Sequence, residues 1–529
     1  MTNVAPVNPG LITSPIYRVK GQRSRWDYPH ERVTPEHCLI LENINLTERG
    51  LAESRFGASK WNSTILANSE SSVGIRQQTY STGQYILVCT PDKVYTDDGS
   101  TRLNATGSLT LTGTVDDYVS FAFMGDKIYA TNGVDVPWDK DNDYIATVGN
   151  AAHISFDASG VSLGTCQQLV EHNGVLIAIA PTEGGVKYPT RIRWSDVDSR
   201  TFIPDPTYWP DANRMEIYQG STPIISAIDN FGSLWIFKED GVYPGRIEYD
   251  VGFLEFRLDE KKILRGFNPV GGHQSMIARP DFIFGIAQEG AFRIDADGNF
   301  KIVTEDIQDQ WESALNLARL KYAVSYVRER DHQVRVLMSG TGNTTGHNLE
   351  LVYDWQTGDV WIDKLTAQVN YATRVVLSNK ESAIGAGIAT NNYIYKFNDP
   401  DAITDDGTAY DWEIRMAPND LGHPGKTKHI VRFKTLYKGR DDQTTVDLTL
   451  FRNEGVLPSR SQTLTPSLGL IWDGGQIWDN GIYWETAGES VQSTAYFVNR
   501  FAETIAPRWK SSAPGAILGY QCEYTIEEG

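Results

Sequence analysis

Apolar and polar positions alternate with a period of two along much of the chain, which is the pattern of β-strands. In the last segment the apolar positions are Leu518, Tyr520, Cys522, Tyr524 and Ile526, with polar or small residues between them. Such alternation places one face of a strand on a core and the other toward solvent. Residues 445–450 alternate in the same way. Both segments are therefore predicted to be strands with one buried face.

The middle of the chain repeats a unit made of an apolar strand, a tight polar turn and a second apolar strand. Clear copies occupy residues 85–95, 121–129, 169–177 and 227–236, and weaker copies lie around 282–284, 334–336 and 393–395. Asn-Gly and Asp-Gly pairs accompany several copies, as hairpin turns require. The copies recur roughly every 40 to 60 residues, close to the length of a four-stranded propeller blade. We therefore predict a β-propeller of about six to eight blades.

The predicted organisation is all-β, with three parts. Residues 1–37 form a polar N-terminal arm, residues 38–400 form the propeller, and residues 401–529 form a C-terminal β-sandwich or platform domain. The last boundary lies at the turn-rich stretch 399–407, beyond which the repeat stops. A single helix is expected near 305–320, because its apolar residues recur with helical spacing. These residues are Ile307, Trp311, Leu315 and Ala318.

The charge of the chain is strongly negative. Its 529 residues include 48 Lys and Arg against 67 Asp and Glu, which gives a formal charge of −19. Such a chain is poorly suited to wrapping nucleic acid, because phosphates are neutralised by concentrated Lys and Arg. The first residues lack the basic and apolar regions of a signal peptide, and no run of about 18 apolar residues occurs. We therefore expect a protein made and kept in a cytoplasm, without a membrane span.

Motifs for catalysis, cofactors and metals fail on inspection. The sequence GVSLG at 160–164 matches GxSxG, but it runs into a predicted hairpin rather than a helix. The four cysteines are widely spaced and form no disulfide or metal-ligand pattern. Asp139, Asp141 and Asp143 are spaced like calcium ligands, but the Gly and Glu of an EF-hand loop are absent, so we interpret them as an acidic exposed loop. We expect no enzyme, no cofactor and no metal site.

A tryptophan cluster is the first candidate partner interface. Trp472, Trp478 and Trp484 lie close together in a stretch that is rich in glycine. Three interpretations stay open. The cluster is a stacking platform for a sugar ring, an anchor for a partner subunit, or an aromatic hairpin packed on its own domain.

A basic stripe is the second candidate partner interface. Lys428, Arg432, Lys434 and Lys438 are expected on one face of a strand that also carries Ile430, and Val431, Phe433 and Tyr437 are expected on the other. In a chain of net charge −19 this stripe either meets an acidic neighbour or is a solvated strand face. The first interpretation permits head-to-tail docking that is guided by charge.

Several phrases of the sequence, taken in order, resemble those of a known family. LENINLTERG at 41–50 and SRFG at 54–57 are similar to the start of bacteriophage tail β-propeller proteins. Further matches are YATNGVDVPW at 129–138, RWSDVD at 193–198, FKEDGVY at 237–243 and VYDWQTGDVW at 352–361. The chain, over residues 38–529, therefore resembles the tail nozzle or hub proteins of short-tailed phages, also called tail tubular protein B or DNA-stabilisation protein.

The resemblance implies a structural protein of the virion tail, made in the cytoplasm of a host bacterium. Such proteins form a hexameric ring below the portal and adaptor proteins, and the ring channels or retains double-stranded DNA. The implied partners are other copies of the chain, portal and adaptor proteins, tail fibres or spikes, and DNA that passes without specific binding. An acidic conduit fits this role, because it repels the phosphates that pass through it.

Two other functional classes stay open. A propeller glycoside hydrolase acting on host-surface polysaccharide would need two carboxylates that face one pocket about 5 to 9.5 Å apart. A glycan-binding protein would use the tryptophan cluster to hold a sugar ring. A cellular interaction propeller is disfavoured, because the Trp-Asp pairs of this chain do not have the spacing of WD40 repeats.

Overall fold

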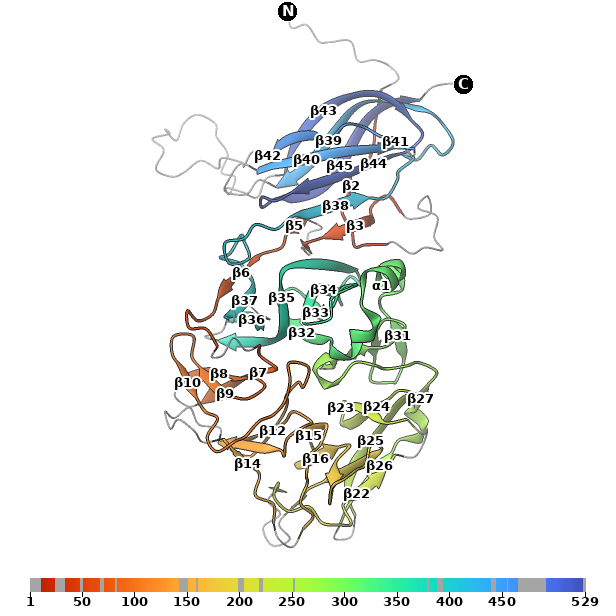
Figure 1. The fold of residues 1–529 in the computed structure, drawn as a ribbon. Coiled ribbons are helices and arrows are strands. Elements are labelled where there is room, and N and C mark those ends of the chain that lie inside the picture. Colours follow the sequence, from red (N-terminus) through yellow and green to blue (C-terminus); the bar gives the residue numbers. More distant parts are fainter. Residues whose placement is uncertain are drawn as a thin grey trace, which may run out of the picture.

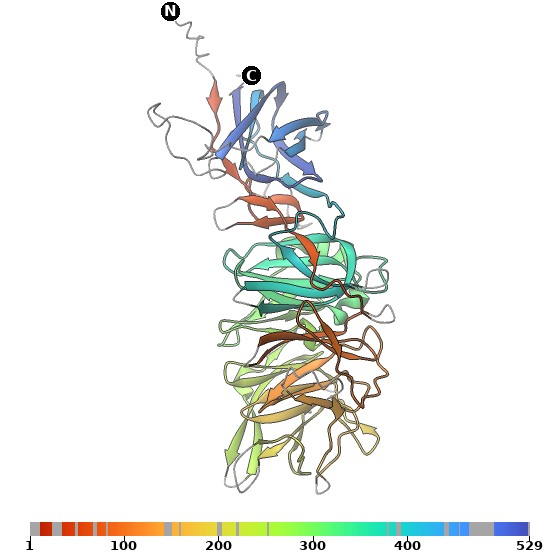
Figure 2. The same cartoon turned by 90° about the vertical axis from the view of Figure 1, so that its left-hand side faces the viewer.

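The computed structural model describes residues 11–23, 34–47, 51–66, 71–80, 83–141, 151–157, 160–197, 204–217, 222–250, 253–377, 380–387, 393–438, 444–453, 455–464 and 491–526. Within these ranges the chain is mostly β-structure and forms a propeller and a sandwich. Two views related by a 90° turn both place the sandwich at one end of an elongated molecule (Figures 1 and 2). The predicted all-β fold with a propeller and a sandwich is confirmed.

Five antiparallel sheets of four or five strands form successive blades. The first holds β7 (Gly74–Tyr80), β8 (Gly83–Cys89), β9 (Val94–Asp97) and β10 (Arg102–Asn104), and the second holds β11 (Ser120–Met124), β12 (Lys127–Thr131), β13 (Trp138–Asp141) and β14 (Ala152–His153). The third holds β15 (Gln168–His172), β16 (Val175–Ile179), β19 (Arg191–Trp194) and β22 (Arg214–Glu216). The fourth holds β23 (Ile224–Asn230), β24 (Ser233–Lys238), β25 (Gly241–Asp250), β26 (Phe253–Leu258) and β27 (Leu264–Arg265), and the fifth holds β28 (Ile277–Ala278), β29 (Ile283–Ile286), β30 (Ala291–Ile294) and β31 (Phe300–Ile302).

Short two-stranded ribbons accompany the third blade. They are β17 (Thr182–Glu183) with β18 (Val186–Lys187), and β20 (Asp196–Val197) with β21 (Pro204–Asp205). Their strands fall between those of the blade in the chain order, so they are excursions from its hairpins.

Two further blades share one long strand. The sheet runs through β32 (Val324–Arg328), β33 (Gln333–Met338), β34 (His347–Asp354), β35 (Val360–Leu377), β36 (Lys380–Gly387), β37 (Ile394–Asp399) and β6 (Gly57–Lys60). The first part of β35 is the outer strand of the sixth blade, and the second part is the inner strand of the seventh. The described strands therefore make seven blades, within the predicted range. Strand β6, from before the first blade, closes the ring by pairing with β37.

Glutamine side chains join neighbouring blades, whose inner strands do not pair with each other in the described part of the chain. Gln168 of β15 donates from Nε2 to the carbonyl of Ala227 at 2.7 Å and accepts at Oε1 from the N–H of Ala227 at 2.8 Å. Gln77 of β7 bonds both main-chain groups of Val376 in the same way, at 2.5 and 2.6 Å. Each glutamine thus satisfies both main-chain polar groups of one residue in the adjacent blade, and in the case of Ala227 these groups are buried.

The sandwich is built from both ends of the chain. One sheet holds β1 (Ile12–Thr13), β2 (Tyr17–Arg18), β4 (Ile44–Leu46), β5 (Ala52–Ser54), β45 (Ala516–Ile526), β39 (Lys428–Lys438) and β43 (Val491–Ala502). The other holds β3 (Cys38–Glu42), β38 (Trp412–Met416), β44 (Ile505–Ser511), β40 (Thr444–Arg452), β41 (Gly455–Val456) and β42 (Arg460–Leu464). Fully buried Phe433, Trp509 and Tyr520 pack together between the two sheets.

The sheet pairing differs from the domain boundaries expected at the N-terminus. Strands β1 and β2, expected in an arm, pair with β45, and β3, expected in the propeller, pairs with β38. The first propeller strand begins at Gly57. Alternation identifies a strand but not its partner, and these partners lie at the opposite end of the sequence. At the other end of the propeller, β37 ends at Asp399 and β38 begins at Trp412, so the chain passes into the sandwich between these residues.

The expected helix near 305–320 is present but shorter and segmented. It consists of α1 (Gln308–Ala314), with 3₁₀ turns at Glu305–Ile307 and Leu317–Tyr322. Trp311 is its anchor, with 1% of its surface exposed. In the ranges that the structure describes, no helix has the length and apolar character needed to cross a membrane.

Candidate functional site

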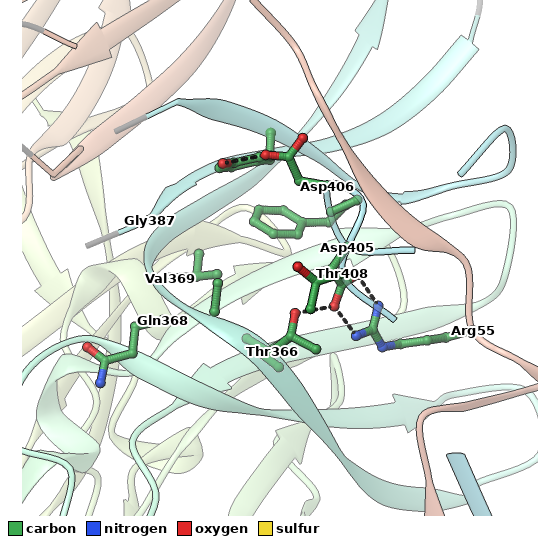
Figure 3. A pocket seen from close by; sticks show the side chains of 13 residues that line it. Arg55, Thr366, Gln368, Val369, Gly387, Asp405, Asp406 and Thr408 are labelled. Carbon is green, nitrogen blue, oxygen red and sulfur yellow. Dashed lines mark hydrogen bonds and ion pairs between the residues drawn. The ribbon is translucent and has the colours of Figure 1, made fainter. Parts of the chain in front are cut away.

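A pocket of about 530 Å³ opens where the last blades meet the connection to the sandwich (Figure 3). One wall is the middle of β35, and the others come from Arg55, β6, β37 and the segment that follows β37. The lining of the pocket is mixed. Its apolar residues include Leu365, Val369 and Phe397, and its polar residues include Thr366, Gln368, Asp405, Asp406 and Thr408.

The pocket lies where β35 leaves one blade and enters the next. Lys364 pairs with Leu349, whereas Val369 pairs with His347, and residues 365–368 have no ladder partner. An interruption of this kind redirects the strand and its side chains. Thr366 donates from this segment to Asp405 at 2.6 Å. The strand switch therefore brings β35 against the connection to the sandwich.

A buried ion pair closes one side of the pocket. The guanidinium of Arg55 donates to both carboxylate oxygens of Asp405, at 2.9 and 2.6 Å, and its Nε donates to Asn43 at 3.1 Å. Arg55 is 4% exposed, and the hydroxyl of Tyr410 donates to its carbonyl. Burial lowers the pKa of Arg55, but the bond to Asp405 outweighs burial, so the pKa is raised. A charged Arg55 therefore fastens the connection to the N-terminal strands.

A second buried arginine extends this network into the sixth blade. Arg335 of β33 lies 2.5 Å from Glu350 of β34 and donates to Asn45 of β4 at 2.6 Å. Asp363 of β35 lies 3.7 Å from Arg335 and accepts from the N–H of Asn43 at 2.6 Å. Burial alone would lower the pKa of Arg335. Electrostatic interactions with its neighbours, the largest of them with Glu350, outweigh burial, so the pKa is raised. We call the network of Asn43, Asn45, Arg55, Arg335, Glu350, Asp363 and Asp405 the joint.

The two carboxylates that line the pocket both interact with neighbouring side chains. Asp405 accepts from Arg55 and Thr366, and Asp406 accepts from the hydroxyl of Tyr395 at 3.2 Å and lies 3.5 Å from Nζ of Lys60. Glycoside hydrolysis uses one carboxyl that supplies a proton and a second that acts as base or nucleophile. Asp405 cannot easily take either role while it holds Arg55.

The predicted basic stripe is divided between two faces. In its pairing with β45, strand β39 carries a β-bulge between Ile430 and Arg432, and one extra residue turns the following side chains to the opposite face. Lys428 therefore faces inward with 1% exposure, and its Nζ donates to the carbonyl of Glu503 at 2.7 Å. Burial lowers the pKa of Lys428. This differs from the expected stripe, which placed Lys428 on the outer face.

The other members of the stripe lie beyond the bulge. Arg432 and Lys434 both approach Glu523 of β45, at 3.5 and 2.5 Å. The backbone of Lys438 pairs with Val491, but its side chain lies outside the described residues. The structure thus brings Arg432 and Lys434 together and separates both from Lys428.

Two exposed phenylalanines beside this stripe were missed in the sequence. Phe497 and Phe501 lie on β43, directly opposite Arg432 and His429 of β39. They are 67% and 47% exposed. Their spacing of four residues in a strand does place both on one face, but the sequence does not reveal that the face is uncovered.

Some of the remaining predicted residues lie in the part of the chain that the structure describes, and the others lie outside it. Asp139 and Asp141 lie on β13 rather than in a loop, and both lie near Lys127, at 3.3 and 3.5 Å. Asp143 and the cluster of Trp472, Trp478 and Trp484 lie outside the described residues. Among the residues described, no group of three or more His, Cys, Asp or Glu side chains is arranged to hold a metal ion.

No family model and no curated protein matches the chain. Among solved structures it is similar to BBS1N in complex with ARL6DN, at 8% identity and TM-score 0.38, covering 66% of this chain and 98% of that one. It is also similar to the Cps50 (Swd1) β-propeller domain of Myceliophteria thermophila, at 9% identity and TM-score 0.36, covering 64% and 98%. A third is AztD from Citrobacter koseri, at 11% identity and TM-score 0.35, covering 67% and 95%. The seven-bladed assignment rests on the strand pairing described above.

Proposed function

We propose that this chain is a structural protein of a bacteriophage tail. It forms a ring, a nozzle or hub, below the portal and adaptor proteins, where it channels or retains DNA and anchors fibres or spikes. The proposal includes a hexameric assembly, a location in the virion and a non-enzymatic role. The proposal is based on several sequence segments that resemble, in the same order, those of bacteriophage tail β-propeller proteins. One structural observation supports it.

That observation is the position of the phrase SRFG within the joint. Arg55 of this phrase forms the buried pair with Asp405, and the N–H of Gly57 donates to the carbonyl of Ala402 at 2.7 Å. The phrase therefore fastens the first strand of the propeller to the connection that leaves its last blade. A tail ring under pressure from packaged DNA needs domains that do not swing, and a buried ion pair held by further hydrogen bonds restricts such motion.

The distribution of charge also supports a conduit. Residues 57–399 carry 29 Lys and Arg against 43 Asp and Glu, so the propeller holds 14 of the 19 excess negative charges. A surface with this balance repels duplex phosphates, whereas basic walls would hold them by release of counterions.

Electron microscopy of the purified chain, with and without co-expressed portal and adaptor proteins of the same genome, tests the proposal. The expected result is a six-fold ring with a central channel, alone or on the portal complex. Single particles that never join the portal complex would contradict it. A second variant, Asp405→Asn, tests the joint. We expect each domain to stay folded, but the sandwich to vary in position from particle to particle, so that its density weakens in the averages.

Glycan binding is the second candidate, because the pocket places carboxylates and hydroxyls beside the Phe397 ring. Polar groups next to an aromatic surface suit a sugar ring. The measurements are reducing-sugar release and binding to host-surface polysaccharide. Binding that is lost in Asp406→Asn would favour this candidate, and loss in Trp478→Ala would instead favour the tryptophan cluster. Sugar release would favour the hydrolase.

A further inference from the structure

The outer surface of the sandwich sheet that contains β39 and β43 carries exposed aromatic rings that contact Arg432 and His429. We define the aromatic–basic face as His429, Arg432, Phe497 and Phe501. Phe497 is 67% exposed and Phe501 is 47% exposed. Exposed rings of this size on a charged surface commonly mark an interaction site.

Cross-strand contacts hold this face in one arrangement. Arg432 lies directly opposite Phe497, and its guanidinium is 4.8 Å from the centre of the ring. His429 lies opposite Phe501 and stacks on it at 4.7 Å, while His429 Nε2 bonds Asn499 Oδ1 at 2.7 Å. Glu523 is the acidic group on the adjacent strand, 3.5 Å from Arg432. Side chains that are already ordered lose little entropy when a partner covers them.

The aromatic–basic face also lies beside a sheet edge. In the described residues β43 pairs with β39 alone and is the last strand in the order of its sheet. A twelve-residue edge strand with outward rings is a surface to which another chain can add. Val456, which is also highly exposed, lies on β41 of the opposite sheet and is not part of this face.

The acidic counterpart lies on the second blade of the propeller. Among the described residues of this blade, 120–141 and 151–153, Lys127 and Lys140 are the only Lys or Arg residues, against Asp126, Asp135, Asp139 and Asp141. Lys140 is buried, and Lys127 is already shared by Asp139 and Asp141. Asp126 and Asp141 are exposed. Strands β12 and β14 of this blade lie toward the end of the molecule away from the sandwich (Figure 1).

We propose that the aromatic–basic face docks on the second propeller blade of another copy of this chain. The basic groups and rings of one copy meet the exposed carboxylates of the next, and the contact is head to tail. Because the two surfaces differ, the interface is heterologous and generates a ring when the rotation between copies closes. This inference rests on the proposed function and adds to it the surfaces that join the ring.

Sedimentation velocity of the full chain over a wide concentration range, at low and high salt, tests the inference. We expect association that weakens as salt increases, because the contact pairs exposed charges. The double variant Arg432→Glu with Phe497→Ser should weaken association by roughly tenfold or more. Combining Arg432→Glu with Asp126→Lys and Asp141→Lys should restore part of it. The control, Val456→Ser with Arg246→Glu, changes a similarly exposed apolar group (61%) and a more exposed arginine (62%, against 35% for Arg432) elsewhere, and should associate like the unmodified chain.

The outcomes separate the inference from the proposed function. A chain that stays monomeric at every concentration, or a double variant that associates normally, overturns the inference. If that double variant also joins the portal complex in six-fold rings, the proposed function stands without this interface. If the chain self-associates through the face but never joins a portal complex, the proposed function fails and the interface stands. Circular dichroism and thermal unfolding of each variant confirm that it is folded.

Discussion

Arg335 and Asp363 lie 3.7 Å apart at the centre of the joint, and neither side chain is exposed to solvent. Arg335 comes from β33 and Asp363 from β35, and the N–H of Asn43 donates to the other oxygen of the same carboxyl. The Oδ2 atom of Asp363 has no hydrogen-bond partner among the described residues. A buried carboxyl with one unsatisfied oxygen is the most sensitive point of the network, because ionising it carries a large desolvation cost.

We predict that Asp363→Asn changes how stability depends on pH. Burial raises the pKa of Asp363 from 3.8 to about 7, and Glu350 adds to the rise, whereas Arg335 opposes it. Between about pH 4 and pH 7 the folded chain therefore holds a proton that the unfolded chain releases, so the free energy of unfolding falls as pH rises. This contribution is on the order of 2 to 4 kcal/mol. The Asn variant should lose it, and urea unfolding across this pH window measures the difference.

Glu289→Gln is the control for this titration, because it removes an exposed carboxylate from the turn between β29 and β30. Its unfolding should follow the unmodified chain at every pH. His273 and His347 also titrate, because burial lowers their pKa values to about 4 and about 3. Their contribution has the opposite sign, since stability falls as pH decreases below about 6.5, and it is common to all three proteins. Parallel curves for Asp363→Asn and the unmodified chain would refute the titration of Asp363.

The Arg55–Asp405 pair should stabilise the joint far more than a surface pair does. Asp405→Asn leaves a buried guanidinium without its charge partner, a change that costs about 3 to 5 kcal/mol. Lys364→Ala is a matched control, because Lys364 also joins the last blades to the N-terminal strands, through Glu42 at 2.8 Å, but is 64% exposed. Its removal should cost less than about 1 kcal/mol. Calorimetry measures both, and equal melting of the two variants would argue against the role given to Arg55.

The sequence predicts the local parts of this fold well, because the residues that specify a hairpin lie close together in the chain. Strand alternation and turn pairs located the repeated units, and Trp311 marked the helix. Non-local pairing is different. Arg55 and Asp405 are 350 residues apart, and no periodicity links them. For the same reason, the sequence did not predict that β6 closes the propeller or that β3 pairs with β38.

The candidate site was harder to predict than the fold. Lys428 was expected on the outer face of β39, since residues 428, 432 and 434 are all even positions. One bulge between Ile430 and Arg432, in the pairing with β45, breaks that parity, and a bulge leaves no mark in the pattern of apolar residues. The sequence does not distinguish Phe497 and Phe501 from buried strand residues, because the exposure of a sheet face depends on what else packs there. A strand pattern therefore identifies faces but not which of them is covered.

Gln168→Ala should destabilise the propeller more than Gln167→Ala. Gln168 satisfies both main-chain groups of Ala227, which is 1% exposed, so its loss leaves a buried donor and a buried acceptor unpaired. The neighbouring Gln167 donates a single bond, to the carbonyl of Ile225 at 2.6 Å. Each buried unpaired group costs roughly 1 to 3 kcal/mol. Urea unfolding followed by tryptophan fluorescence should rank the two variants in this order, and the reverse order would contradict the bridging role of Gln168.

Closure of the ring should depend on the absence of a side chain at Gly57. A Cβ at this position would overlap the main chain of Thr404, because β6 passes directly against the connection to the sandwich. Backbone cannot move aside as a flexible side chain does, so Gly57→Ala should separate β6 from β37 and destabilise the chain by roughly 1 to 3 kcal/mol or more, where a tolerated Gly-to-Ala change stabilises by about 0.4 to 1 kcal/mol. Gly455→Ala is the control, since its Cβ would meet only the carbonyl of Arg452 at 3.5 Å. Hydrogen exchange of β37 amides should accelerate in Gly57→Ala alone, and unchanged protection there would show that the ring closes without β6.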